Sequence, residues 1–183
     1  MNVVFDAFCG RGGWTKGFLA EGFRVIGLDI KQWPSFPDEA EFIQADIRAF
    51  DARFLRGEVD VAIGSPPCNE FSLAKWWRKS TLKSPPKPEM GVNLVNHYKR
   101  VVNEIEPRFW LFENVMNAQK WLGKADAIIR FCDYGFPVGS RRALWGTVPL
   151  LPRNPVEPTL PDLPTRFPRH DDQTGERSEI PLP

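Results

Sequence analysis

Seven short apolar runs alternate with segments of helical pattern along the first 147 residues. The runs cover residues 3–6, 24–29, 42–46, 59–64, 109–113, 127–131 and 142–147. Runs of this length, separated by turn residues and helix-like stretches, are typical of strands joined by crossover helices. The pattern therefore predicts an α/β domain with βαβ units around a largely parallel sheet.

Two helices fall between these runs. Four apolar residues recur at three- and four-residue steps and give one apolar helical face, namely Val95, Tyr98, Val102 and Ile105. This spacing is that of an amphipathic helix, and Pro107 is expected to close it. A second helix-like stretch follows the first run and extends to Glu21, where Gly22 can cap it.

Two segments break the alternation. Residues 75–88 are rich in lysine, arginine, tryptophan and proline, which predicts a long basic and aromatic loop. In the tail, prolines stand at every third position from 149 to 164, a spacing suited to a polyproline II helix with three residues per turn. We therefore expect a catalytic domain over residues 1–148 and an extended proline-rich tail over residues 149–183.

Composition narrows the class of protein. The chain has 42% apolar and 26% charged residues and a formal charge of +1, which favours a soluble globular protein over a disordered or membrane protein. No apolar run approaches the ~20 residues of a membrane span, so we expect a cytoplasmic protein of a bacterial or phage-infected cell. Its three cysteines show no CxxC spacing, so neither a disulfide framework nor a metal site is expected.

A glycine-rich turn follows the first run, at residues 6–13. Such a turn lets a ligand lie close to the backbone, at the strand end where open α/β sheets bind ligands. Its spacing does not match the GxGxxG pattern of dinucleotide sites, because Thr15 stands where the third glycine belongs. A tight turn without a ligand is the alternative. Asp29 and Asp46 end the second and third runs, where one carboxylate can meet ribose hydroxyls and the other an adenine amino group, although each alone could be a solvated strand end.

The fourth run leads into Pro66-Pro67-Cys68, where two prolines restrict the backbone before a thiol. A fixed cysteine at a strand end suits nucleophilic catalysis, for which its pKa of about 8.5 must usually be lowered by its surroundings. The fifth run ends in Glu113 at the same edge of the predicted sheet. A carboxyl group in a partly apolar site has a raised pKa and can hold or deliver a proton.

Taken in order, these pieces resemble the DNA (cytosine-5) methyltransferases, over residues 1 to about 147. The resemblance implies a Rossmann-like fold that uses S-adenosylmethionine to methylate carbon 5 of cytosine in DNA. It implies that Cys68 attacks the base, that Glu113 contacts its amidine edge, and that Arg142 contacts the base or a phosphate. The cofactor residues that it implies are Asp6, Phe8, Gly10, Gly12, Gly13, Asp29, Ile30, Asp46, Ile47 and Pro66.

The sequence also departs from the family pattern. Asn69 replaces the usual Gln, and Val138 and Ser140 replace the Gln and the first Arg of a Gln-x-Arg-x-Arg region. Nothing after Thr147 resembles a target-recognition domain or the returning helix that completes the cofactor pocket. The chain is thus most similar to compact enzymes of phage and prophage genomes, and a second protein chain that supplies target recognition is a candidate partner.

Nucleic-acid contact is expected mainly from the basic and aromatic loop, because its cations can meet phosphates while a tryptophan stacks on a base. The residues concerned are Lys75, Trp76, Trp77, Arg78, Lys79 and Lys83. A solvated loop anchored by one tryptophan is the simpler alternative. Two other functions stay open: the same chemistry on RNA or a free cytosine nucleotide, and a non-catalytic nucleic-acid-binding subunit.

Overall fold

The computed structural model describes residues 2–72 and 85–147 of the chain. These residues form one sheet of seven strands, which are β1 (Val3–Ala7), β2 (Arg24–Asp29), β3 (Glu41–Gln44), β4 (Val61–Gly64), β5 (Phe109–Asn114), β6 (Ala127–Arg130) and β7 (Arg141–Gly146). All seven predicted strands are present, with ends that agree to within two residues. The helices are α1 (Gly13–Ala20), α3 (Pro88–Ile105) and α4 (Gln119–Leu122), and the 3-10 turns are η1 (Arg53–Leu55), η2 (Met116–Ala118) and η3 (Phe131–Asp133).

The strand order is β3-β2-β1-β4-β5-β7-β6. Strands β1 to β5 run parallel, whereas β7 lies antiparallel to both of its neighbours, β5 and β6. The chain moves outward from β1 in one direction to β2 and β3, and in the other to β4 and β5. Open sheets bind ligands at such a switch point, beyond the carboxyl ends of the strands. In this sheet the switch point lies beside β1, so a ligand site is expected beyond the carboxyl ends of β1, β2 and β4.

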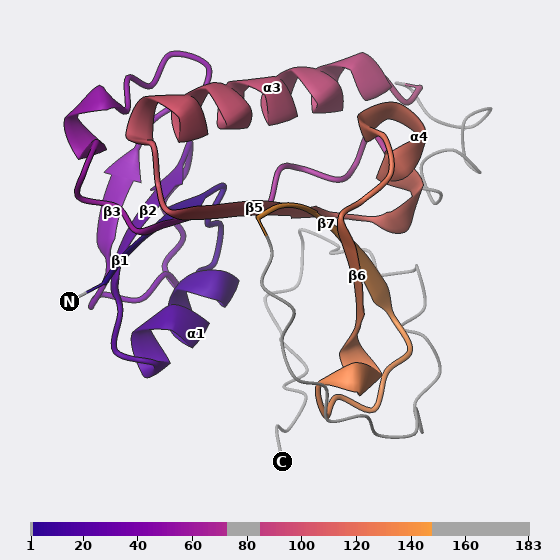
Figure 1. Cartoon of the computed structure of the whole chain (residues 1–183), viewed down its shortest axis with the longest axis horizontal. Coiled ribbons are helices and arrows are strands. Elements are labelled where there is room, and N and C mark those ends of the chain that lie inside the picture. The colour runs from indigo at the N-terminus through magenta and orange to yellow at the C-terminus, as the bar shows by residue number, and fades with distance from the viewer. Residues whose placement is uncertain (1, 73–84, 148–183) are drawn as a thin grey trace, which may run out of the picture.

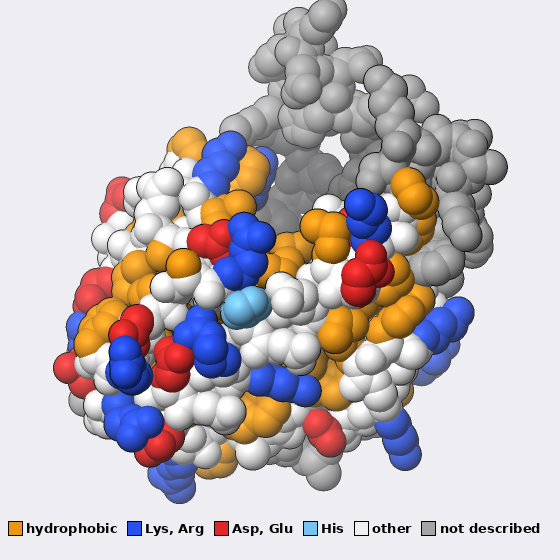
Figure 2. All heavy atoms as spheres, turned by 90° about the horizontal axis from the view of Figure 1, so that it is seen from above, with side chains coloured by type: hydrophobic (Ala, Val, Ile, Leu, Met, Phe, Trp, Pro, Cys, Tyr) orange, Lys and Arg blue, Asp and Glu red, His pale blue; other side chains and the backbone are white. Residues whose placement is uncertain are grey.

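Helix α3 covers one face of the sheet (Figure 1). Its buried side chains pack with the strands into the larger core cluster, where the Phe112 and Trp145 rings stack at 4.9 Å. Tyr98 of α3 lies so close to β4 that a Cβ on Gly64 would come within 2.7 Å of its ring. Only glycine permits this approach of helix to sheet. On the outward side, Lys and Arg side chains are interspersed with Asp and Glu (Figure 2), as expected of a solvated helix face.

Helix α3 begins earlier than its apolar face predicts. Pro88 occupies its first turn, where a missing backbone N–H has no cost, and Val95 stands two turns further on. The helix ends at Ile105, followed by Glu106 at φ 54° and by Pro107, which agrees with the predicted end. The two extra turns at the start of α3 extend to the edge of the sheet.

Helix α1 lies on the other face of the sheet (Figure 1). Here the core is small: Val4, Val25 and Ile63 are buried, and partly buried side chains of α1 pack against them. Between α1 and the β6–β7 pair, this face is hollowed into an apolar groove. The two faces of the sheet therefore differ, one closed by α3 and the other open beside α1.

Candidate active site

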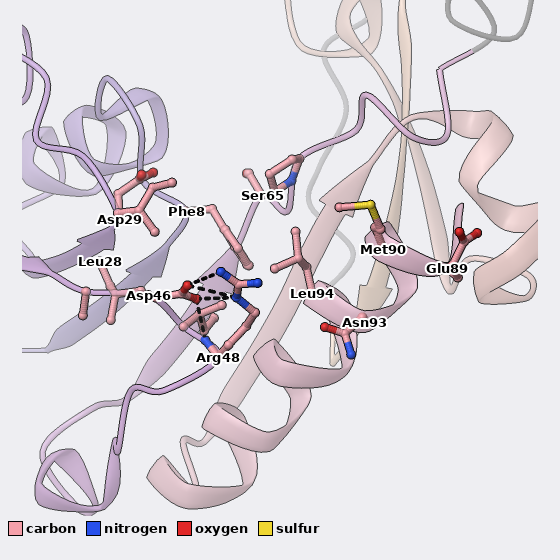
Figure 3. Close-up of a pocket in the computed structure, with 14 residues that line it drawn as sticks. Phe8, Leu28, Asp29, Asp46, Arg48, Ser65, Glu89, Met90, Asn93 and Leu94 are labelled. Atoms are coloured by element: carbon pink, nitrogen blue, oxygen red, sulfur yellow. Dashed lines mark hydrogen bonds and ion pairs between the residues drawn. The ribbon is translucent and has the colours of Figure 1, made fainter. Parts of the chain in front are cut away.

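A cavity of about 650 Å³ opens at the carboxyl ends of β1, β2 and β4. Its walls come from the strand ends on one side and from the first turns of α3 on the other (Figure 3). The lining residues are Phe8, Leu28, Asp29, Ile30, Ala45, Asp46, Ile47, Arg48, Ser65, Pro67, Glu89, Met90, Asn93 and Leu94. The volume lies within the range of small-molecule sites, about 300–1,000 Å³.

The turn after β1 has an unusual backbone that suits close approach to a ligand. Phe8, Gly10 and Gly12 all have left-handed φ values, of 58°, 52° and 79°. Gly12 is required for two reasons: its φ is left-handed, and a Cβ at this position would lie only 2.6 Å from the Pro37 ring. The turn ends where α1 begins.

Asp29 holds this turn from the end of β2. One of its carboxylate oxygens, Oδ2, accepts the Gly10 N–H at 2.9 Å, and the other, Oδ1, accepts the Lys31 N–H at 3.2 Å. Each carboxylate oxygen has a second lone pair, so Asp29 can still accept from ribose hydroxyls. Asp29 therefore both shapes the turn and lines the cavity.

Asp6 lies beneath the turn and not in the cavity. Its side chain is fully buried, and its Oδ2 accepts a hydrogen bond from the Thr15 hydroxyl of α1 at 2.6 Å. The other oxygen, Oδ1, has no hydrogen-bond partner among the described residues, and burial raises the pKa of Asp6 from 3.8 to about 7. The structure thus gives Asp6 a supporting position under the glycine-rich turn, with no direct access to a ligand in the cavity.

Asp46 lines the cavity, but its carboxylate is already engaged. It pairs with the guanidinium of Arg48 at 2.5 Å and accepts the Arg48 backbone N–H at 2.9 Å (Figure 3). The hydrogen bonds from Arg48 lower the pKa of Asp46 to about 2. A carboxylate with this pKa stays ionised and remains an acceptor for an amino group.

Five predicted cofactor residues line the cavity: Phe8, Asp29, Ile30, Asp46 and Ile47. Of the others, Gly10 and Gly12 shape the turn, Pro66 is buried between two lining residues, and Gly13 lines the apolar groove beside α1. Sequence reasoning missed the wall formed by Glu89, Met90, Asn93 and Leu94 of α3. The spacing of Met90 and Leu94, one helical turn apart, was the available signal.

The loop that carries Cys68 leaves β4 and is fixed from two sides. Asn114, at the end of β5, donates its side-chain N–H to the Pro66 carbonyl at 3.0 Å, and both groups are buried. The backbone N–H groups of Phe71 and Ser72 then donate to the Cys68 carbonyl, each at 3.0 Å, which closes a turn. Cys68 is half-buried, and two residues that precede it in this loop, Ser65 and Pro67, line the cavity.

The three predicted catalytic residues come together. Arg142 Nε of β7 lies 2.9 Å from Glu113 Oε1 of β5, and both side chains are only partly exposed. Burial raises the pKa of Cys68, the Glu113 charge raises it further, and Arg142 opposes both effects. Burial also raises the pKa of Glu113, against Arg142. The thiol, the carboxyl group and the guanidinium therefore share one electrostatic environment.

Comparison with known proteins identifies the family. The family model for C-5 cytosine-specific DNA methylase matches residues 3–125. A Methanocaldococcus jannaschii protein named as type II methyltransferase M.MJ0563P is 31% identical over 214 residues, which cover all of this chain and 68% of the relative. Type II methyltransferase M.XorII of Xanthomonas oryzae is 32% identical over 126 residues, which cover 62% of this chain and 28% of the relative. The chain belongs to the C-5 cytosine-specific DNA methylase family.

A solved structure agrees with this assignment. A prophage-encoded E. coli protein described as a DNA modification methyltransferase superposes with a TM-score of 0.56 at 25% identity, over 80% of this chain and 47% of that chain. The predicted fold class and the predicted family are therefore confirmed, and with the family comes S-adenosylmethionine as methyl donor. This chain spans between about a quarter and two thirds of the length of the methylases that it matches.

The family match includes two of the three catalytic candidates. Cys68 and Glu113 lie within residues 3–125, whereas Arg142 lies beyond them. The structure nevertheless brings Arg142 to Glu113, because β7 pairs with β5 in antiparallel register. Arg142 therefore lies outside the segment that the family model matches, and the pairing of β7 with β5 brings it to Glu113.

The remaining predictions concern nucleic acid, metal and membrane. The predicted nucleic-acid-binding residues, from Lys75 to Lys83, lie outside the described residues. In the described parts of the chain, no three His, Cys, Asp or Glu side chains gather as a metal site requires. None of the described helices has the length and apolar character needed to cross a membrane.

Proposed function

We propose that this chain transfers a methyl group from S-adenosylmethionine to carbon 5 of cytosine in DNA, with Cys68 as covalent nucleophile. One observation carries the proposal: Cys68 shares an electrostatic environment with the Glu113–Arg142 ion pair, in the loop whose Ser65 and Pro67 line the large cavity. A thiol, a carboxyl group with a raised pKa and a ligand-sized cavity thus lie near the carboxyl ends of neighbouring strands.

The cavity fits the cofactor in size and in the polar groups at its rim. Asp29 offers carboxylate lone pairs to ribose hydroxyls, Asp46 offers them to an adenine amino group, and Ile30 and Met90 offer apolar surface to a ring. Phe8, in the turn after β1, lines the cavity with a left-handed φ, so the backbone of the turn can approach the ligand. When bound, S-adenosylmethionine supplies an electrophilic methyl group.

The residues of the chain account for the activation of the base. The Cys68 thiolate adds to carbon 6 of cytosine and forms a C–S bond, while Glu113 supports a proton at ring nitrogen 3. Carbon 5 then becomes an enamine carbon and accepts the methyl group. Loss of the carbon-5 proton and elimination of the Cys68 thiolate restore the ring, so that one difficult step becomes several easier ones.

The electrostatics indicate an order of events. While Glu113 is ionised, its charge raises the pKa of Cys68 and opposes formation of the thiolate. Burial favours a neutral Glu113 and Arg142 favours an ionised one. A protonated Glu113 that meets the base therefore removes the charge that opposes Cys68, which couples base binding to activation of the nucleophile.

The basic loop is our candidate for the DNA contact, because both of its ends are fixed beside the nucleophile. Glu70, two residues after Cys68, accepts the Lys87 backbone N–H at 2.5 Å and so ties the start of α3 to the Cys68 loop. Residues 75–83 span the interval between these two points. A base in a duplex must be extruded to reach Cys68, and the cations and aromatic rings in the sequence of this loop suit such a step.

The direct test is methyl transfer from labelled S-adenosylmethionine to duplex DNA, single-stranded DNA, RNA and cytidine nucleotides. We expect 5-methylcytosine in DNA by mass spectrometry of nucleosides. We also expect a covalent complex to accumulate on DNA that contains 5-fluorocytosine, because fluorine cannot leave as the carbon-5 proton does. Product on RNA or nucleotides alone would replace DNA as the substrate, and no product on any of them would refute the proposal for the isolated chain.

We further propose that a second protein chain supplies target recognition. M.XorII is aligned over only 28% of its length, and the rest of that methyltransferase has no counterpart among the aligned residues. The test adds fractionated extract of the host cell to the transfer assay. Methylation that becomes confined to one sequence only with extract supports a partner, and sequence-specific methylation by the pure chain excludes one.

A further inference from the structure

The ribbon of β6 and β7 carries two arginines that the proposed chemistry leaves without a role. The ribbon projects from the sheet with the turn η3 at its tip (Figure 1). Residues 127–146 include three arginines but only one acidic side chain. One of these arginines, Arg142, pairs with Glu113 at 2.9 Å in the site described above. The other two, Arg130 and Arg141, are exposed.

Arg130 and Arg141 stand directly opposite each other on the two strands. The Phe131 N–H donates to the Ser140 carbonyl at 3.0 Å, so the adjacent residues, Arg130 and Arg141, form a non-hydrogen-bonded pair of the ladder. In such a pair the Cα atoms are only about 4.5 Å apart, and the side chains lie closer than in a hydrogen-bonded pair. Two guanidinium groups, which stay charged, therefore leave one side of the ribbon from neighbouring positions.

Little negative charge balances this pair. Asp133 reaches Arg130 through Nε at 3.2 Å, yet the Arg130 side chain is still 50% exposed. No carboxylate in residues 2–72 and 85–147 forms an ion pair with Arg141. Like charges directly opposite each other destabilise an antiparallel pair of strands. A phosphate between the two groups would relieve the repulsion, and the planar guanidinium matches phosphate geometry.

The pair lies at the edge of the sheet that carries the nucleophile. Arg130 ends β6 and Arg141 begins β7, and the antiparallel register of β7 places both at the carboxyl end of β5. Side chains alternate along a strand, so Arg141 faces the same side of the sheet as Asn114. Asn114 donates to the Pro66 carbonyl and so anchors the loop of Cys68. A nucleotide whose base reaches Cys68 therefore brings its phosphates to this edge.

We propose that Arg130 and Arg141 together bind one backbone phosphate of the DNA substrate, beside the nucleotide that enters the active site. This inference rests on the proposed function, because it takes DNA as the substrate. The alternate residues of the ribbon, Ile129 and Arg142, line the second cavity, which is the apolar groove beside α1. One side of the ribbon thus serves the chemistry and the other holds the backbone. Phosphate contacts position the substrate and carry no sequence information.

Salt-dependent binding of labelled duplex DNA to the full chain, measured by fluorescence anisotropy, tests the pair. Replacing both arginines by Gln should weaken binding roughly 10- to 100-fold at low salt, as expected for lost charge-assisted hydrogen bonds. The slope of log affinity against log salt should fall by about 0.9, the value for one phosphate. Arg108→Gln is the matched control, since Arg108 is exposed and precedes β5 at the opposite edge of the sheet. Unchanged affinity and slope in the double variant overturn the proposal, as does an equal loss in Arg108→Gln.

Two further measurements distinguish a shared phosphate from a structural role. If both arginines hold one phosphate, each single variant should lose nearly as much affinity as the double variant. Losses that simply multiply would indicate independent contacts and refute a shared phosphate. Without DNA, Arg141→Gln should raise Tm by about 1–3 °C, because it removes one of two opposed like charges. A lower Tm would mean that Arg141 stabilises the fold, which contradicts the proposal.

The outcomes also separate this proposal from the proposed function. If the double variant binds DNA and forms 5-methylcytosine as the wild type does, the phosphate contact is refuted and the methyl transfer stands. If the wild-type chain binds no DNA, both are refuted. The double variant should keep wild-type affinity for S-adenosylmethionine by calorimetry, since neither arginine lines the cofactor cavity. A parallel loss of cofactor affinity would show general damage to the fold and would count against a phosphate contact.

Discussion

The two cavities of this methylase have nearly the same volume, about 650 and 630 Å³, but opposite chemistry. The first lies beyond the strand ends, where Asp29 and Asp46 bring carboxylates to its rim. The second lies on a sheet face, where Phe18 and Phe136 make it aromatic. Strand ends present polar residues that can hold a ligand, whereas a sheet face presents apolar residues that another layer of secondary structure usually covers.

The loop with Cys68 contacts residues of both cavities. Ser65 lines the first cavity and accepts a hydrogen bond at 3.0 Å from Trp14, which lines the second. Glu113 lines the second and influences the pKa of Cys68. The proposed chemistry therefore involves residues that line both cavities, and variants on either side should separate their roles.

The largest expected effect is that of Cys68→Ser. The hydroxyl is close to the thiol in size but is a far weaker nucleophile, so the rate of methyl transfer should fall by roughly 10⁴-fold or more. Calorimetry should show nearly unchanged affinity for S-adenosylmethionine. Cys132→Ser is the control, because Cys132 lines neither cavity. Activity of Cys68→Ser within a few-fold of wild type would contradict the covalent role.

Glu113→Gln should follow, with a rate loss of about 10²–10⁴-fold, the usual size of a general acid–base contribution. It should also change Cys68 before any substrate binds. Removal of the Glu113 charge lowers the pKa of Cys68, so alkylation of Cys68 by iodoacetamide should begin at lower pH.

The matched control for this variant is Glu21→Gln. Glu21 lines the second cavity, as Glu113 does, but it does not contribute to the pKa shift of Cys68. Rates of alkylation, followed by mass spectrometry as a function of pH, give the comparison. An identical pH profile in Glu113→Gln and wild type would show that the two groups are not coupled.

The sequence predicts the strands well, because each is a short apolar run bounded by turn or helix-like residues, whether its neighbours are parallel or, as for β6 and β7, antiparallel. It predicts the first turns of α3 poorly. There Met90 and Asn93 border a cavity and not the core, so the apolar period breaks down although the helix continues. Apolar periodicity follows burial in the core, and residues that border a cavity do not keep to it.

Apolar periodicity also gives no information on contacts between residues that are distant in the sequence. Thr15 is visible in the sequence only as a missing glycine, whereas in the structure its hydroxyl donates to Asp6. The Glu113–Arg142 pair depends on the antiparallel register of β7 on β5, which no local pattern encodes. Family resemblance, and not local pattern, singled out Arg142.

Asp6→Asn should alter the pH dependence of stability. The folded pKa of Asp6, about 7, lies above its unfolded value of 3.8, so the folded state binds the proton more tightly. Stability from this group is then fully present below pH 4 and is lost as pH rises to about 7, by roughly 4 kcal/mol at most at 1.36 kcal/mol per pKa unit. Urea unfolding at pH 5 and pH 8 should show a smaller difference for Asp6→Asn than for wild type, and equal differences would contradict the assignment.

The smallest effect should come from Asp29→Ala, and it sharpens the contrast between the cavities. Loss of charge-assisted hydrogen bonds worth about 1.5–3 kcal/mol should weaken S-adenosylmethionine binding roughly 10- to 150-fold, because Asp29 lines the cavity and also holds the Gly10 N–H. Asp46→Ala should cost less, since the Asp46 carboxylate is already shared with Arg48. Phe136→Asp, in the second cavity, should leave this affinity unchanged. Calorimetry on the three variants tests the ranking, and an affinity for Asp29→Ala equal to wild type would remove Asp29 from the cofactor site.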